Sequence, residues 1–177
     1  MKNLVLAIAL VVPTIAFAED DDEKVPPTIT CDQFRERFTD ALIGNGEGVS
    51  LASLFTGAKR QKFDVPGIQA AIGCTADGMF EGFGASLLEA DDGSVKRYTR
   101  FSGAAVRAIE PRFDHAEAIQ VVVDLTRQAL EDARNTERKS GWLQGSAEKK
   151  FGSYVVDYRM NNSLVSTHID LRYKNAE

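Results

Sequence analysis

The sequence predicts an α+β fold: a mainly antiparallel sheet of two hairpin units, about five strands in all, packed against one long helix and an N-terminal helix. Three observations lead to this prediction. Asp77-Gly78 and Asn161-Asn162 each lie between two runs of alternating apolar and polar residues, the pattern of a β-hairpin. Between the hairpins, residues 114–133 repeat apolar side chains every three or four positions, the spacing of an amphipathic helix.

Residues 1–18 have the features of a secretory signal peptide. Lys2 precedes an apolar run from Leu4 to Val12, and Ala16-Phe17-Ala18 matches the small-residue pattern of a cleavage site. The apolar run is too short to cross the roughly 30 Å of membrane hydrocarbon, so we expect cleavage after Ala18 rather than a membrane anchor. The mature protein is therefore predicted to be periplasmic or secreted.

Residues 19–29 begin with five consecutive acidic residues and contain two prolines, so we expect a solvated, disordered tail. Residues 30–177 are long enough for a single α+β domain. The chain has a net charge of -5 and would repel phosphate groups. Neither nucleic acid nor an anionic membrane surface is therefore an expected partner, and no stable membrane insertion is expected after signal cleavage.

The N-terminal helix is predicted to begin near Thr30, which forms a capping-box pattern with Gln33, and to end at the glycines from Gly44 onward. Residues 50–55 predict a short helical turn, and residues 61–65 predict a strand that ends at Pro66-Gly67. One face of the helix collects apolar side chains by their spacing, namely those of Cys31, Phe34, Phe38, Ala41 and Leu42.

The first hairpin is predicted over residues 68–87, with Asp77-Gly78 as a two-residue loop in which both residues have positive φ. This register pairs Cys74 with Glu81. The other face carries small residues, which would let another backbone approach closely: Ala71, Gly73, Gly82, Gly84 and Ser86. The predicted core face carries Ile68, Ala70, Ile72, Cys74, Met79, Phe83, Ala85 and Leu87, with Glu81 as the one polar member.

Cys31 and Cys74 are the only cysteines, and both fall on predicted core faces. Two cysteines in an exported protein are most simply joined in one disulfide. The alternative, a reactive thiol, needs an electropositive and partly open setting. Cys31 lies near a helix start, so this alternative stays open, but Cys74 has only Ile72, Gly73 and Thr75 around it.

After the first hairpin, a turn at 91–93 is predicted to lead into a third strand over 94–101, followed by a short helix that Pro111 ends. Asp114 and Glu117 form a second capping-box pattern at the start of the long helix. Residues 135–150 are predicted to be a polar connection. The apolar stripe predicted for the long helix is Ile119, Val122, Val123, Thr126, Ala129, Leu130 and Ala133.

The last hairpin is predicted to turn at Asn161-Asn162, with Met160 paired to Ser163. The long helix is expected to cover its apolar face. That face carries Tyr154, Val156, Tyr158, Met160, Val165, Thr167, Ile169 and Leu171, and the opposite, polar face carries Asp157, Arg159, Ser166, His168, Asp170 and Arg172.

The sequence contains few candidates for catalysis. It has no phosphate-binding loop, nucleophile elbow or dinucleotide fingerprint, and we predict no cofactor, no metal site and no catalytic residue. Ser166, His168 and Asp170 alternate on one strand, where side chains two positions apart lie about 7 Å from each other. That spacing is too wide for a direct hydrogen-bond relay, so we interpret them as a polar solvent face.

Trp142 and Leu143 are the candidate partner-binding residues. Trp142 is the only tryptophan and lies in the predicted polar connection. It would either fold back against the edge of the core or anchor a partner, since aromatic residues on loops concentrate interface energy. The sequence therefore favours a non-catalytic module that binds a protein or an envelope component. The alternative is a small hydrolase of an envelope polymer that uses Asp and Glu carboxylates.

Overall fold

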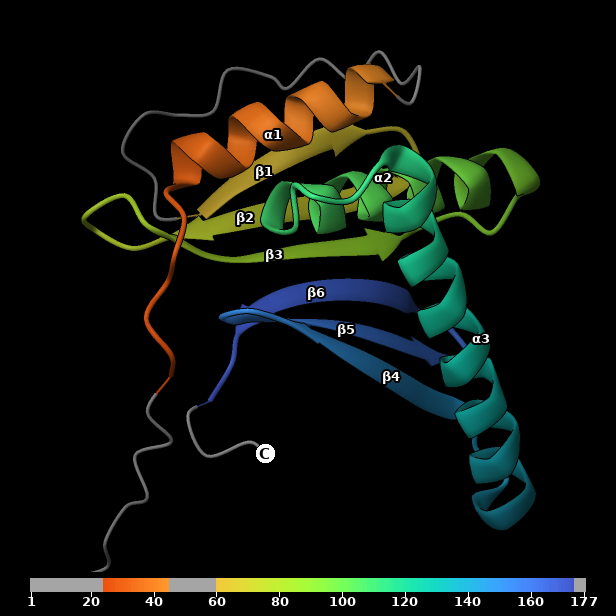
Figure 1. Cartoon of the computed structure of the whole chain (residues 1–177). Coiled ribbons are helices and arrows are strands. Elements are labelled where there is room, and N and C mark those ends of the chain that lie inside the picture. The colour runs from red at the N-terminus through yellow and green to blue at the C-terminus, as the bar shows by residue number, and fades with distance from the viewer. Residues whose placement is uncertain (1–23, 45–59, 174–177) are drawn as a thin grey trace, which may run out of the picture.

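The computed structural model describes residues 24–44 and 60–173, which form three helices and six strands (Figure 1). The predicted signal peptide, the acidic run 19–23 and the predicted turn at 50–55 lie outside these residues. In chain order the elements are α1 (Cys31–Gly44), β1 (Arg60–Val65), β2 (Ile68–Cys74), β3 (Phe80–Leu87), α2 (Asp92–Ile109), α3 (His115–Ser140), β4 (Gln144–Phe151), β5 (Tyr154–Asn161) and β6 (Val165–Leu171).

The six strands form one antiparallel sheet in the order β1-β2-β3-β6-β5-β4. Two three-stranded units, β1–β3 and β4–β6, therefore meet where β3 pairs with β6, as Figure 1 shows. The predicted α+β fold class is confirmed, and so is the strand that ends at Pro66-Gly67. The sheet gains β4 from a stretch that we predicted to be a polar connection.

All three helices lie on one face of the sheet and close the core there. The predicted face of α1 is confirmed, since its buried residues are the five named above. Phe34 stacks on Phe80 of β3 with ring centroids 4.0 Å apart, and Phe38 meets Phe101 of α2 edge-on at 5.0 Å. Burial of large aromatic rings is a major source of folding free energy, so this cluster joins α1, α2 and β3.

The predicted third strand over 94–101 is wrong, because these residues belong to α2. The side chain of Asp91 accepts hydrogen bonds from the backbone N–H groups of Gly93 and Ser94, at 2.9 and 3.0 Å, and so caps the helix. Tyr98 and Phe101 are then buried on the same helical face. The Asp-Asp-Gly stretch that suggested a hairpin turn is a helix start.

The predicted capping box of α3 is confirmed: Glu117 N donates to Asp114 at 2.8 Å, and Asp114 N donates to Glu117 at 2.8 Å. The helix continues to Ser140, and only residues 141–143 connect it to β4, so the predicted connection over 135–150 is wrong. The predicted stripe is partly wrong because Val123 is exposed. The buried side is made by Ala118, Val121, Val122, Leu125, Ala129 and Ala133.

The first hairpin keeps its predicted register only as far as Gly73, which pairs with Gly82. Cys74 then pairs with Phe80 instead of Glu81, across a β-bulge. The loop is Ala76–Gly78, and only Gly78 has positive φ, at 82°, so the predicted two-residue turn is wrong. The bulge has a clear physical reason: it places Phe80 in the core and leaves Glu81 exposed.

The last hairpin has a loop of four residues, and Met160 pairs with Val165 rather than Ser163. The side chain of Asn161 accepts hydrogen bonds from the N–H groups of Ser163 and Leu164, both at 2.9 Å, which holds the wider loop. The register is therefore shifted by two residues. An even shift preserves the face of each side chain, so Tyr154, Tyr158 and Ile169 are buried as predicted.

Residues 24–29 differ from the disordered tail that we predicted. Lys24 forms a β-bridge with Tyr173, and Val25 N donates to Arg172 O at 2.7 Å. Ile29 is buried, and its carbonyl accepts from Phe80 N at 3.0 Å. This segment thus runs past the end of β6 and leads into α1.

Candidate functional site

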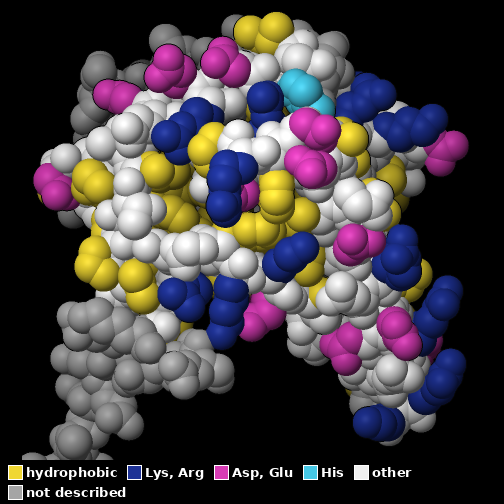
Figure 2. Space-filling model, viewed as in Figure 1, with side chains coloured by type: hydrophobic (Ala, Val, Ile, Leu, Met, Phe, Trp, Pro, Cys, Tyr) yellow, Lys and Arg dark blue, Asp and Glu magenta, His cyan; other side chains and the backbone are white. Residues whose placement is uncertain are grey.

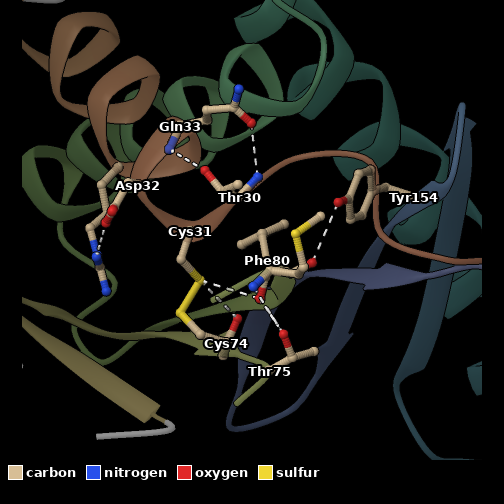
Figure 3. The surroundings of a disulfide bond; sticks show 11 residues. Thr30, Cys31, Asp32, Gln33, Cys74, Thr75, Phe80 and Tyr154 are labelled. Atoms are coloured by element: carbon tan, nitrogen blue, oxygen red, sulfur yellow. Dashed lines mark hydrogen bonds and ion pairs between the residues drawn. A yellow bond between two sulfur atoms is a disulfide. The ribbon is translucent and has the colours of Figure 1, made fainter. Parts of the chain in front are cut away.

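The predicted disulfide between Cys31 and Cys74 is confirmed, with the two Cα atoms 6.1 Å apart (Figure 3). It joins the first residue of α1 to the last residue of β2. The predicted capping box lies beside it, because Thr30 N donates to Gln33 Oε1 at 2.9 Å and Gln33 N donates to Thr30 Oγ1 at 3.1 Å. Both cysteines of the chain are used in this bond, so the alternative of a reactive thiol is removed.

The face of the sheet opposite the helices has no described helix over it. One row of residues crosses it through all six strands, because each residue pairs with the next on the neighbouring strand. The first hairpin contributes the small side chains to this face, as predicted. From β1 to β4 the row is Lys62, Ala71, Gly84, His168, Asp157 and Glu148.

This uncovered face has two unlike halves. Over β2 and β3 it is hollowed into a groove of about 580 Å³ whose floor includes Ala71, Gly73, Gly82 and Gly84. Over β5 and β6 it carries large polar side chains, and a second groove of about 490 Å³ runs between β4 and β6. The imidazole of His168 lies at the boundary, since a Cβ on Gly84 would stand 3.4 Å from its Nδ1 atom.

On the polar half of this face, one carboxylate is held in an ion pair and one hydroxyl group is buried. Asp157 accepts a hydrogen bond from Arg159 Nε at 2.5 Å, so an ion pair occupies its carboxylate. Ser166 was predicted to face solvent, but it is only 2% exposed, because it lies between Ser86 of β3 and Arg159 of β5 on a central strand. Ser166, His168 and Asp170 do alternate along β6, and no hydrogen bond among them is present in the described structure.

A carboxyl group that acts as a general acid at neutral pH needs a raised pKa. In residues 24–44 and 60–173, every carboxyl group whose pKa is clearly shifted has a lowered pKa. Within the same ranges, no group of three His, Cys, Asp or Glu side chains is placed to hold a metal ion. Hydrogen bonds lower the pKa of three carboxyl groups away from the uncovered face: Asp77 from Thr75, Asp91 from Ser94, and Glu110 from Arg112.

Trp142 and Leu143 occupy the short connection between α3 and β4. Gly141 ends the helix with φ of 75° and donates its N–H to Glu137 O at 2.8 Å, which turns the chain back toward the sheet. Trp142 is then 72% exposed, whereas Leu143 is half-buried. Of the two alternatives for Trp142, this exposure contradicts the one in which the side chain folds back against the edge of the core.

The Trp142 connection lies at a strongly charged end of the molecule. Figure 1 shows α3 extending beyond β4, the edge strand, and Figure 2 shows Lys and Arg side chains together with Asp and Glu side chains along this part of the helix. The last helical turn includes Arg138 and Lys139. Trp142 follows this basic last turn directly in the chain and is exposed. Aromatic anchors within a polar rim are typical of protein-binding surfaces.

Comparison with known proteins adds no family to this description: no protein-family model matches the chain, and neither the curated proteins nor the solved structures contain a significant match. Within the described ranges, none of the three helices combines the length and the apolarity needed to cross a membrane.

Proposed function

We propose that this protein is an exported, non-catalytic module that binds a protein or an envelope component, with Trp142 as its anchor. The observation that carries the proposal is the 72% exposure of the only tryptophan, on a rigidly capped connection. A large indole left in water costs free energy, and burial in a partner would recover it. Export is supported by the signal-peptide pattern and by the disulfide, since such bonds persist in oxidising compartments.

A hydrolase of an envelope polymer has one observation in its favour, the pairing of His168 on β6 with Asp157 on β5. The guanidinium of Arg159 already occupies that carboxylate. Hydrolysis by two carboxyl groups also requires a proton donor at a defined separation across the bound polymer. The geometry therefore supports binding better than hydrolysis.

Trp142→Ala tests the proposed anchor. We expect the melting temperature to stay close to that of the wild type, because exposed positions contribute within about 0.5 kcal/mol of stability. Partner binding should weaken by about 2 kcal/mol, or roughly 30-fold, the size typical of an interface anchor. A photo-reactive residue at position 142, used in the native envelope, identifies the partner.

The matched control places the same photo-reactive residue at Tyr173, an exposed aromatic on the segment that pairs with Lys24. Crosslinking at position 142 but not at position 173 supports the proposal. Equal labelling at both positions, or unchanged partner binding by Trp142→Ala, would remove Trp142 from the binding surface.

A further inference from the structure

We propose that the uncovered face of the sheet binds a short stretch of a neutral saccharide chain, in the two grooves that meet at His168. His168 lines both the groove of about 580 Å³ over β2 and β3 and the groove of about 490 Å³ between β4 and β6. Each volume lies within the range of about 300–1,000 Å³ that is usual for small-ligand sites. The inference goes beyond the proposed function, because it concerns this face and does not depend on Trp142.

The first observation is a buried hydroxyl group in the groove between β4 and β6. Ser166 is only 2% exposed, and it lines this groove together with His168. Within the described part of the chain, Ser166 Oγ forms no hydrogen bond. A buried hydroxyl group without a partner costs free energy, which a hydrogen bond to a bound molecule would recover. Ser166 therefore indicates that a polar ligand enters this groove.

The second observation is Gly73 on β2, where the fold does not require a glycine. Glycine weakens a strand, and inside one it often marks a bulge or the close approach of a ligand. Gly73 is not among the glycines with positive φ, so the bulge that follows it does not need a glycine. A Cβ on Gly73 would meet nothing nearer than the backbone of Gly82, at 3.9 Å. The missing side chain thus leaves the floor of the first groove open.

The chain's own polar side chains form the walls of this first groove. His168 and Asp170 of β6 lean over the glycines of β3 with which they pair. The open floor is therefore on β2, at Gly73, and Lys62 of β1 lies on its other side. A ligand on this floor would meet an imidazole and a carboxylate at one wall and an ammonium group at the other.

Charge favours a ligand without net charge. In the second groove Arg159 and Asp157 form an ion pair, which leaves Glu148 as the remaining charged group. Neither groove has the excess of cations that binds phosphate groups. Sugar hydroxyl groups both donate and accept hydrogen bonds, so they satisfy ammonium and carboxylate groups together. The first groove has two charged side chains of each sign, namely Lys24, Lys62, Glu81 and Asp170.

A peptide fits this face less well than a saccharide. Extended peptides are commonly bound at the edge of a sheet, where free main-chain groups pair with them and pockets receive their side chains. The grooves lie over strands that already pair within the sheet, so little main chain is available there. Ile72 and Phe83, the large apolar residues of the first groove, are buried on the helix side and give it no apolar wall.

Isothermal titration calorimetry of the purified protein tests the proposal. The probes are a panel of short neutral oligosaccharides of hexoses and N-acetylhexosamines, an oligosaccharide of uronic acids, and a peptide of serine and alanine. At least one neutral oligosaccharide should bind with a dissociation constant of about 1 mM or lower. The uronic acid oligosaccharide and the peptide should bind more weakly, because the grooves offer neither excess positive charge nor free main chain.

Two variants should weaken this binding without weakening the fold. Gly73→Val fills the floor and should raise the dissociation constant at least about tenfold, and Ser166→Ala removes one hydrogen bond and should raise it about fivefold. Neither should lower the melting temperature, because valine favours a strand and alanine removes a hydroxyl group that has no partner. Thr99→Ala removes a hydroxyl group from α2, on the other side of the sheet, and is the matched control that should bind like the wild type.

Three results would overturn the proposal: no binding of any neutral oligosaccharide, tighter binding of the uronic acid oligosaccharide or the peptide, or binding that either variant leaves unchanged. A lower molar mass for Gly73→Val than for the wild type would also overturn it, since the face would then hold a second copy of the chain. Capture of a protein at position 142 without saccharide binding would remove this site and leave the Trp142 anchor in place.

Discussion

Gly145 is the residue at which β4 contacts α3. A Cβ on Gly145 would press against the carbonyl oxygen of Ala129 and lie 2.8 Å from the Cβ of Ala133. Both neighbours belong to the rigid helix, so neither can move aside cheaply. The absence of a side chain at this one position allows the edge strand to lie against the helix.

Gly145→Ala should therefore lower the free energy of unfolding by about 1–3 kcal/mol, the usual cost of overpacking a tight contact. Chemical denaturation of the purified protein measures it. Gly84→Ala is the matched control in the same sheet, because its Cβ would meet only the His168 ring at an ordinary 3.4 Å. Equal stability of the two variants would show that β4 can move away from α3.

At the scale of elements, the disulfide fastens α1 to the first hairpin. Cys31 and Cys74 are 43 positions apart in the chain, so the bond closes a long loop in the unfolded state. Replacing both cysteines by alanine should lower the free energy of unfolding by about 4 kcal/mol in the chain-entropy model. Denaturation with and without a reductant measures the same quantity in the unmodified protein. Agreement within about 1 kcal/mol is expected, and no change on reduction would contradict the prediction.

The contact between α2 and β6 contains a buried tyrosine. Tyr98 Oη lies 2.8 Å from Thr167 Oγ1, and burial raises the pKa of Tyr98 above its ordinary value of 10.0. Below pH 10 the hydroxyl group is protonated in both states. Above that pH the unfolded chain loses the proton while folded Tyr98 keeps it, so the free energy of unfolding should fall as pH rises.

Tyr98→Phe should reduce this alkaline loss of stability, measured by denaturation between about pH 8 and pH 11. It should also be less stable than the wild type at neutral pH, by about 1 kcal/mol, because Thr167 loses its partner. Phe101→Leu is the control, since it disturbs the same helix without removing a titrating group. A Tyr98→Phe variant with the wild-type pH slope would show that other groups cause the alkaline loss.

At the scale of the whole molecule, the Cys31–Cys74 disulfide fits the export that we propose, since such bonds persist in compartments that oxidise thiols. If residues 1–18 are removed on export, the recovered protein should begin at Glu19. Its intact mass should be lower than that of the reduced chain by the mass of two hydrogen atoms, because the disulfide has formed. Mass spectrometry of protein recovered from outside the cytoplasm measures both. A chain that keeps Met1, or that carries two free thiols after export, would contradict this expectation.

Local chemistry in the sequence predicted several features correctly. The two capping boxes, at Thr30 and Asp114, depend on side chains three residues from the backbone groups they bind. The buried face of α1 follows from the helical period, and the faces of the last hairpin follow from the period of a strand. These features depend on neighbours in the chain, so they can be read without knowing the fold.

The tertiary structure decided the features that depend on distant residues. Residues 94–101 form a helix because Asp91 caps them and the aromatic core receives Tyr98 and Phe101. The bulge beside Cys74 exists because the core accepts Phe80 and excludes Glu81. In both cases the local structure depends on which side chain is buried in the core. The core forms only when the whole chain has folded, so the local sequence cannot decide it.

The disulfide could be predicted from the sequence because the chain has only two cysteines to pair. The exposure of Trp142 could not be predicted, because it depends on where α3 ends and on how the chain turns into β4. The uncovered face shows the same division. Alternation in the first hairpin predicted its small residues, but only the order β1-β2-β3-β6-β5-β4 brings Gly84 beside His168, since long-range strand pairing has no local signal.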